Sequence, residues 1–167
     1  MVPLRVLTLV VVGQNQPSVL VLEPVEETLP GKSRVVPIWI GDNEATQLSL
    51  AINHVKLPRP TTHDLFLDAI TNLDARVDHV LINKIEGKLF HAQLFIKQGD
   101  RIIKLDSRPT DAIALALRQE APLYITKEAL ERASFPYLFK TSRSQEEELE
   151  SFKLFLEELA PDDFAGQ

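Results

Sequence analysis

The segment Leu105–Leu117 constrains the fold more than any other part of the chain, because it predicts a helix with almost no polar face. A helix that is apolar on nearly every side has to be buried. Asp106, Arg108 and Asp111 fall at its start, where an unpaired charge is costly. Two interpretations are open: an ordinary helix start, with Pro109 in the first turn and Arg108 paired with Asp111, or a functional site.

A second junction between an apolar strand and a helix lies upstream, around Glu44. Setting Glu44 on Asp111 also places Leu48 on Leu115, which suggests a duplicated strand-helix unit. If the two units pack about a pseudo-two-fold axis, Glu44 and Asp111 occupy equivalent helix starts. The periodicity of residues 42–55 places Glu44 near the apolar stripe, where a buried carboxylate needs a partner. The simplest partner is a hydrogen bond from the backbone amides at the start of the helix.

The remaining patterns predict a single compact α+β domain over residues 1–140, largely an antiparallel sheet with packed helices. Its strands are expected over residues 4–12, 18–25, 34–40, 77–85, 89–97, 101–105 and 123–125. Besides the buried helix after Leu105, helices are expected over residues 42–55 and 61–73, and from residue 127, with Thr126 as the cap of the last.

The helix expected over residues 61–73 begins at a threonine cap, Thr61 or Thr62. Its periodicity predicts an apolar face made of Leu65, Phe66, Ala69, Ile70 and Leu73. Leu67 then lies on the far, exposed side of the helix, where an apolar side chain favours assembly with another subunit. Asp64 lies opposite the apolar face, which predicts a capping carboxylate or one favoured by the helix dipole.

Three motifs, taken in their order and spacing, resemble the bifunctional nuclease domain family. They are Pro37-Ile38-Trp39-Ile40-Gly41 followed by Glu44-Ala45, then Arg59-Pro60-Thr61-Thr62-His63-Asp64-Leu65, then Asp106-Ser107-Arg108-Pro109-Thr110-Asp111-Ala112-Ile113-Ala114-Leu115-Ala116. The resemblance covers roughly residues 4–135. It implies a compact α+β domain, often dimeric, with members that cleave both DNA and RNA, and it assigns no catalytic residues.

The residues themselves narrow the chemistry. The sequence contains no phosphate-binding glycine-rich loop, no GxSxG or HExxH motif and no cysteine. The remaining acids, arginines and histidine suit phosphodiester hydrolysis assisted by Mg²⁺ or Mn²⁺. We assign Glu44, Asp106 and Asp111 as metal ligands, Arg59 and Arg108 as phosphate clamps, and His63 as general acid or base, with Asp64 beside it as a further catalytic candidate. A structural His63 remains the alternative.

The net charge of −6 is unevenly distributed. Residues 144–163 hold eight acids and one base, so this segment carries −7 and the rest of the chain is near +1. The charge of the residues outside this segment therefore does not exclude phosphate binding, although the sequence contains no basic stripe that would indicate it. Residues 141–167 are expected to form an acidic amphipathic helix and tail, whose apolar stripe has to dock on this subunit or another.

These features predict a cytoplasmic protein with DNA and RNA as substrates, no membrane association and a homodimer or larger assembly. The chain lacks cysteine, and its opening apolar run is too short to span a bilayer. The alternative is a non-catalytic oligomeric binding or regulatory module, in which the motif charges are structural ion pairs. Acids and arginines that share one solvent-open pocket would favour the nuclease, and closed buried pairs would favour the module.

Overall fold

The strands of the described residues form one sheet, in the order β6-β5-β4-β7-β1-β2-β3-β8, in the computed structural model. This structure describes residues 1–11, 17–25, 33–136 and Leu154. The strands are β1 (Val2–Val10), β2 (Ser18–Pro24), β3 (Arg34–Ile40), β4 (Ala75–Glu86), β5 (Leu89–Gln98), β6 (Arg101–Ser107), β7 (Leu123–Ile125) and β8 (Phe135–Pro136). The helices are α1 (Asp42–Ile52), α2 (Thr62–Asn72), α3 (Pro109–Arg118) and α4 (Lys127–Ala133). The predicted α+β class is confirmed.

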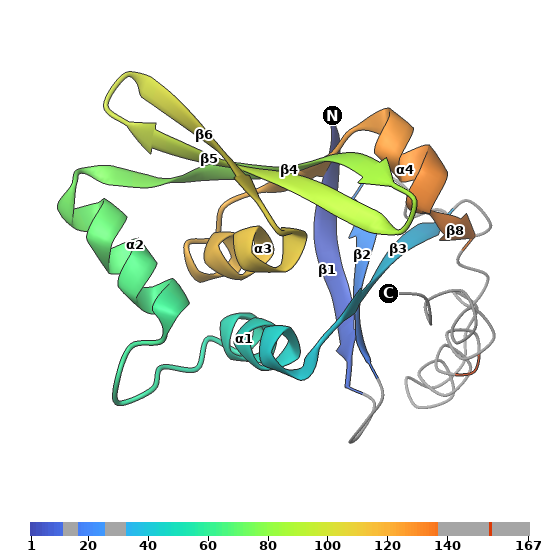
Figure 1. Cartoon of the computed structure of the whole chain (residues 1–167), viewed down its shortest axis with the longest axis horizontal. Coiled ribbons are helices and arrows are strands. Elements are labelled where there is room, and N and C mark those ends of the chain that lie inside the picture. The colour runs from blue at the N-terminus through green and yellow to red at the C-terminus, as the bar shows by residue number, and fades with distance from the viewer. Residues whose placement is uncertain (12–16, 26–32, 137–153, 155–167) are drawn as a thin grey trace.

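Two antiparallel three-stranded meanders, each followed by a helix, make up most of the fold (Figure 1). β1-β2-β3 leads into α1, and β4-β5-β6 leads into α3. The short strand β7 joins the two meanders, antiparallel to β1 and parallel to β4. This repeat of topology agrees with the duplicated strand-helix unit expected from the sequence. Superposition of residues 34–55 on residues 101–120 stays a prediction.

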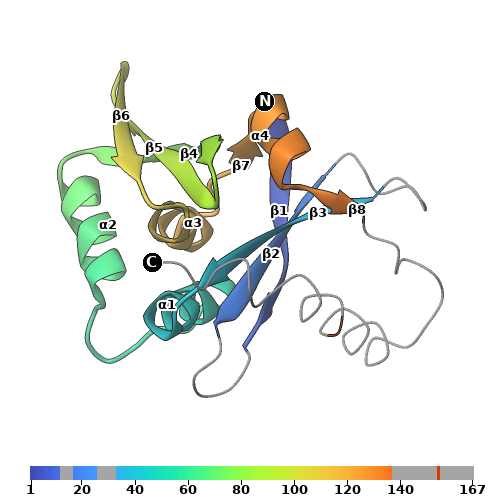
Figure 2. The same ribbon diagram turned by 45° about the vertical axis from the view of Figure 1, so that its right-hand side comes forward.

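The main core lies between the helices and the inner face of the sheet. α3 packs on β4 and β5 and also contacts α1 and α2 (Figure 2). Ile113 of α3 is 0% exposed, as is Leu22 of β2, and Val80 of β4 is 1% exposed. Because neighbours surround α3 on most sides, its nearly all-apolar sequence is buried, as predicted.

The apolar face predicted for α2 was wrong in part, because only Phe66 and Ile70 of its five residues lie against the core. Leu67 and Ile70 are buried, each at 8% exposed. Three residues of the predicted face are exposed instead: Leu65, Ala69 and Leu73. α2 packs mainly on β4 and α3, at one side of the molecule (Figure 1). The rotation of α2 about its own axis points Asp64 toward Arg118 of α3. Asp64 and Arg118 form an ion pair, which the periodicity of the sequence does not predict.

The helix predicted over residues 42–55 is too long, because α1 ends at Ile52. His54 has a φ of 51°, a left-handed conformation that cannot continue the helix. Val55 is consequently half exposed instead of lying on the buried stripe.

The expected boundary at residues 140 and 141 and the acidic amphipathic tail lie outside the described residues. Within the described residues, no helix is both long enough and apolar enough to cross a bilayer.

Thr126 caps α4, as the order of residues around it predicts. Its Oγ1 accepts a hydrogen bond from Ala129 N at 3.2 Å and donates one to Asn83 O at 3.3 Å. Thr126→Ala is expected to lower the free energy of unfolding by about 1 kcal/mol in urea denaturation. The control Thr62→Ala, at an exposed position outside a cap, should change it by less than about 0.5 kcal/mol. Equal effects of the two substitutions would contradict the capping role.

Candidate active site

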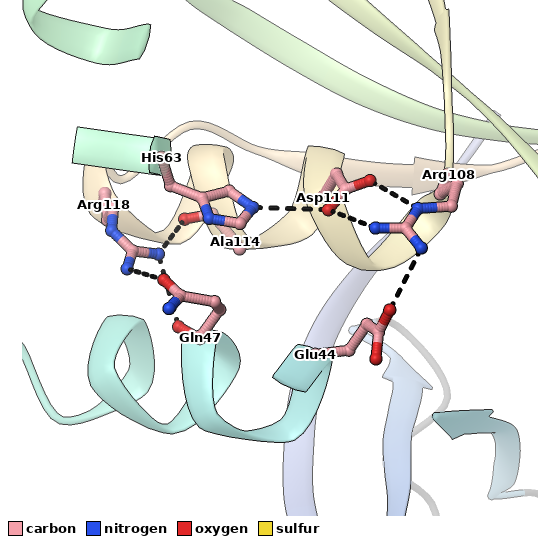
Figure 3. Close-up of polar contacts among 7 residues, drawn as sticks. All are labelled: Glu44, Gln47, His63, Arg108, Asp111, Ala114 and Arg118. Carbon is pink, nitrogen blue, oxygen red and sulfur yellow. Dashed lines mark hydrogen bonds and ion pairs between the residues drawn. The ribbon is translucent and has the colours of Figure 1, made fainter. Parts of the chain in front are cut away.

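Arg108 bridges the N-termini of α1 and α3 (Figure 3). Its Nε donates to Asp111 Oδ2 at 2.7 Å and its Nη2 donates to Asp111 Oδ1 at 3.2 Å. Its Nη1 donates to Glu44 Oε1, 3.0 Å away on α1. Glu44 and Asp111 are each the third residue of their helix, so the expected pairing of equivalent helix starts is confirmed.

Short local sequences place these side chains. Arg108 is the N-cap residue of α3, followed by Pro109, whose fixed φ suits the first helical position. Gly41 is the corresponding N-cap residue of α1. A Cβ at Gly41 would lie 2.7 Å from Glu44 Oε2, so glycine leaves room for this carboxylate to fold over the helix start.

His63 reaches the same cluster from the first turn of α2. Its Nε2 lies 3.4 Å from Asp111 Oδ1, which is longer than an ordinary hydrogen bond. Its Nδ1 is buried and has no hydrogen-bond partner among the described residues. Any proton exchange with a ligand would therefore go through Nε2. We call Glu44, His63, Arg108 and Asp111 the Arg108 cluster.

The Arg108 cluster is open to solvent. The Arg108 side chain is 67% exposed, and the Asp111 and Glu44 side chains are 34% and 25% exposed. Partial burial raises the pKa of Asp111, but hydrogen bonds and charge from Arg108, with a contribution from His63, bring that pKa below its ordinary value. Asp111 in turn raises the pKa of Arg108. The pair is therefore ionised at neutral pH.

Asp64 belongs to a second network, centred on Arg118, whose side chain is less exposed than that of Arg108. Its Oδ2 accepts hydrogen bonds from Thr61 N at 2.8 Å and Thr61 Oγ1 at 2.7 Å, so the predicted capping role is confirmed. Its Oδ1 accepts from Arg118 Nε at 2.8 Å. Arg118, whose side chain is 11% exposed, also donates to Gln47 O, Gln47 Oε1 and Ala114 O. These bonds tie α1, α2 and α3 together.

Three residues assigned from the sequence lie outside the Arg108 cluster: Asp64, in the network with Arg118, and also Asp106 and Arg59. Asp106 pairs with Gln93 in the β5–β6 ladder, so its exposed side chain points to the outer face of the sheet, away from α3. Arg59 is exposed in the connection between α1 and α2. Neither Asp106 nor Arg59 forms an ion pair with a described residue. The sequence reasoning also missed Arg118, although its position seven residues after Asp111 places it on the same side of the helix.

The carboxylates do not form the three-acid metal centre expected from the sequence. Within the described ranges, no group of three or more histidines and acids is arranged to hold a metal ion. Glu44 and Asp111 offer oxygen atoms, but both are already bonded to the Arg108 guanidinium, and Asp106 lies on the other face of the sheet. The need for Mg²⁺ or Mn²⁺ stays a prediction.

Sequence comparison assigns this α+β domain to a known family. Residues 24–137 match the bifunctional nuclease domain, so the chain belongs to this family, as its three motifs predicted. An uncharacterized protein of Mycobacterium tuberculosis is 37% identical over 156 residues, which cover 90% of each chain.

Plant proteins are similar over a shorter region. Bifunctional nuclease 2 of Oryza sativa subsp. japonica is 33% identical over 98 residues, 57% of this chain and 30% of the plant protein. Bifunctional nuclease 1 of Arabidopsis thaliana is 26% identical over 100 residues, 58% of this chain and 31% of the plant protein. The similarity therefore spans less than a third of each of these plant proteins.

Acid should weaken the fold through Asp64 and Asp111. For Asp64, burial raises the pKa, but hydrogen bonds from Thr61 and the Arg118 ion pair bring it below the ordinary value. A carboxyl with a lowered folded pKa stabilises the protein above its unfolded pKa, and this stabilisation disappears as pH falls through the folded pKa. We expect the free energy of unfolding to drop below pH about 4.

Urea denaturation at a series of pH values measures this drop. The Asp64→Asn variant should be less stable at neutral pH and lose less stability in acid than the parent. The matched control is Asp100→Asn, at an exposed acid in the turn between β5 and β6, and it should follow the parental stability curve. A curve for Asp64→Asn parallel to that of the parent would rule out the proposed linkage.

Proposed function

We propose that this protein hydrolyses phosphodiester bonds of DNA and RNA at the Arg108 cluster. The observation that carries the proposal is an exposed guanidinium held by three hydrogen bonds to two carboxylates. A guanidinium has five N–H donors, so two remain, one on each terminal nitrogen, to bind phosphate oxygens as a fork. The N-termini of α1 and α3 add positive partial charge at the same place.

His63 is the proposed proton carrier, acting through Nε2. Its long contact with Asp111 leaves Nε2 loosely held, while Asp111 keeps the ring facing the cluster. The substrates are assigned as both DNA and RNA because the plant relatives are named bifunctional nucleases, and because a phosphate fork does not require a particular sugar.

The experiment is cleavage of labelled DNA and RNA by Asp111→Asn. This substitution keeps the shape but removes the charge that holds Arg108, so cleavage should fall by about 100-fold or more. The matched control is Asp106→Asn, an acid on the outer face, which should cleave like the parent. Cleavage has to co-elute with the protein, because a contaminating nuclease gives a similar weak activity. A parental rate for Asp111→Asn would contradict the proposal.

Metal dependence is a separate arm of this experiment. We propose that EDTA abolishes cleavage and that Mg²⁺ or Mn²⁺ restores it, with Glu44 and Asp111 as the available ligands. A cation there would supply a Lewis acid close to the phosphate, and Arg108 would have to release part of its contacts. An unchanged cleavage rate in EDTA would contradict the metal requirement but not the proposed role of Arg108.

A non-catalytic binding or regulatory module is the second candidate, favoured by the closed Asp64–Arg118 network and by the pairing of both Arg108 acids. In that case Asp111→Asn would lose stability, and rigorously purified parent would not cleave. Calorimetry together with the cleavage assay separates the two functions.

We also propose that the protein is cytoplasmic and forms a homodimer or larger assembly. Leu67, one basis for expecting assembly, is buried, but Leu65, Ala69 and Leu73 form an exposed apolar stripe on α2 in its place. A monomeric mass by light scattering at micromolar concentration would contradict assembly.

A further inference from the structure

Three rings form a row on the outer face of the sheet, the face turned away from α3. His79 on β4 and Phe95 on β5 are directly opposite each other, and their rings stack with centroids 4.1 Å apart and planes 13° apart. Tyr124 on β7 meets His79 edge-on, at 5.7 Å and 81°. Val80 and Leu94, next along the strands, point into the core, so alternation places the rings outside. We call His79, Phe95 and Tyr124 the aromatic row.

No described helix covers this part of the outer face. α1, α2 and α3 all lie on the other side of β4, β5 and β6 (Figures 1 and 2). The three rings are half-buried because they pack against one another and against the neighbouring strands.

Three exposed cations stand beside the aromatic row. Arg76 and Lys97 are directly opposite each other across β4 and β5, and Lys104 of β6 is directly opposite Phe95. None of the three forms an ion pair with a described residue. Like charges directly opposite in a sheet are destabilising, and an anionic ligand would offset that cost.

Three acids on these strands form no ion pair with Arg76, Lys97 or Lys104. Asp78 Oδ2 lies within hydrogen-bonding distance of His79 Nδ1, 2.7 Å away. Glu86, at the far end of β4, pairs with Lys84. Asp106 lies opposite Gln93, farther along β6. The surface around Phe95 is therefore aromatic at its centre and cationic at its rim.

We propose that the outer face of β4, β5 and β6 binds single-stranded nucleic acid by stacking an unpaired base on Phe95. This inference rests on the proposed function and adds the strand form of the substrate. His79 covers one face of the Phe95 ring, so the other face is turned toward β6 and Lys104. A base on that face extends the aromatic row, and its flanking phosphates reach Lys97 and Lys104. Bases of a duplex are already stacked and paired, so they cannot bind in this way.

β6 connects this binding face to the Arg108 cluster. Lys104 and Arg108 are four residues apart, which is about 13 Å along an extended strand. β6 is the edge strand of the described sheet, so no further described strand stands between its outer face and the start of α3. A nucleic-acid strand held on Phe95 can pass over this edge to the Arg108 guanidinium.

The test is binding of a fluorescently labelled oligothymidine, followed by anisotropy, to full-length protein carrying Asp111→Asn to suppress cleavage. Phe95→Leu should weaken binding about tenfold, because the apolar volume remains but the ring is lost. Phe95→Trp should bind at least as tightly as the parent. Lys97→Gln with Lys104→Gln should lower the salt slope of log K by about 1.4, since each phosphate contact to single strands contributes about 0.7. Circular dichroism checks the fold of each variant.

The matched control is Lys56→Gln with Arg132→Gln, two exposed cations, one in the connection between α1 and α2 and one near the end of α4. It should bind oligothymidine with the parental affinity and salt slope. Parental binding by Phe95→Leu, or equal affinity for oligothymidine and a duplex, would overturn the proposal.

The two proposals fail differently. If the parent does not cleave but folded Phe95→Leu loses single-strand binding, the binding face stands and the nuclease proposal fails. If Arg108→Gln loses cleavage while Phe95→Leu binds and cleaves single strands like the parent, the binding face fails and the nuclease proposal stands.

Discussion

Arg108→Gln is expected to lower cleavage of DNA and RNA by about 10²–10³-fold, the effect of removing one main electrostatic stabiliser of a reacting oxyanion. Glutamine keeps a polar side chain but cannot hold Asp111, Glu44 and a phosphate at once. Arg108→Lys should also lose most activity, because an ammonium is a point charge without the planar fork. Single-turnover cleavage of labelled oligonucleotides measures both variants.

Stability controls this experiment. The Arg108 side chain is 67% exposed, so its ion pairs should contribute no more than about 1 kcal/mol to the free energy of unfolding. The variants are therefore expected to fold. The control Arg132→Gln, at an exposed arginine of α4, should cleave like the parent. Parental cleavage by Arg108→Gln would show that the guanidinium takes no part in the reaction.

Arg118→Met is expected to lower the free energy of unfolding by about 1–3 kcal/mol, because the acceptors of Arg118 lose their hydrogen bonds while the Asp64 side chain, 37% exposed, is partly screened by water. Arg118 is 11% exposed and donates hydrogen bonds to Asp64, Gln47 and Ala114, so three helices lose a shared partner. Methionine fills much of the volume but satisfies none of the acceptors. Urea denaturation gives the change.

A second substitution tests the cause of that loss. Adding Asp64→Asn to Arg118→Met removes the uncompensated carboxylate and should recover part of the lost stability. The control Arg132→Met, at the exposed α4 position, should change stability by less than about 0.5 kcal/mol. A small effect of Arg118→Met would mean that the network between the helices is not what stabilises them.

Local patterns predicted much of the fold and the centre of the site. The strand over residues 34–40, the cap at Thr126 and the buried α3 follow from alternation, capping residues and apolar runs, all of which act over a few neighbours. The internal repeat predicted that Glu44 and Asp111 occupy equivalent helix starts, and Arg108 bonds to both.

Tertiary contacts decided what the local patterns could not. Apolar residues occur on several sides of α2, so the sequence pattern alone did not specify which side faces the core. The Asp64–Arg118 ion pair and the burial of Leu67 determine it. Asp106 is two residues from Arg108, yet strand alternation sends its side chain to the outer face. Arg59, although part of a motif, lies in an exposed connection and is not brought to the Arg108 cluster.

Chemical rescue of Arg108→Ala tests most directly whether the Arg108 guanidinium acts in phosphodiester cleavage. The measurement is the single-turnover cleavage rate of this variant with and without millimolar guanidinium, beside the parent and Asp111→Asn. Added guanidinium should restore part of the rate of Arg108→Ala and leave the parent and Asp111→Asn unchanged, an outcome that a contaminating nuclease cannot imitate. Parental cleavage by Arg108→Ala without guanidinium, or equal stimulation of all three proteins, would contradict the proposed role of this cluster.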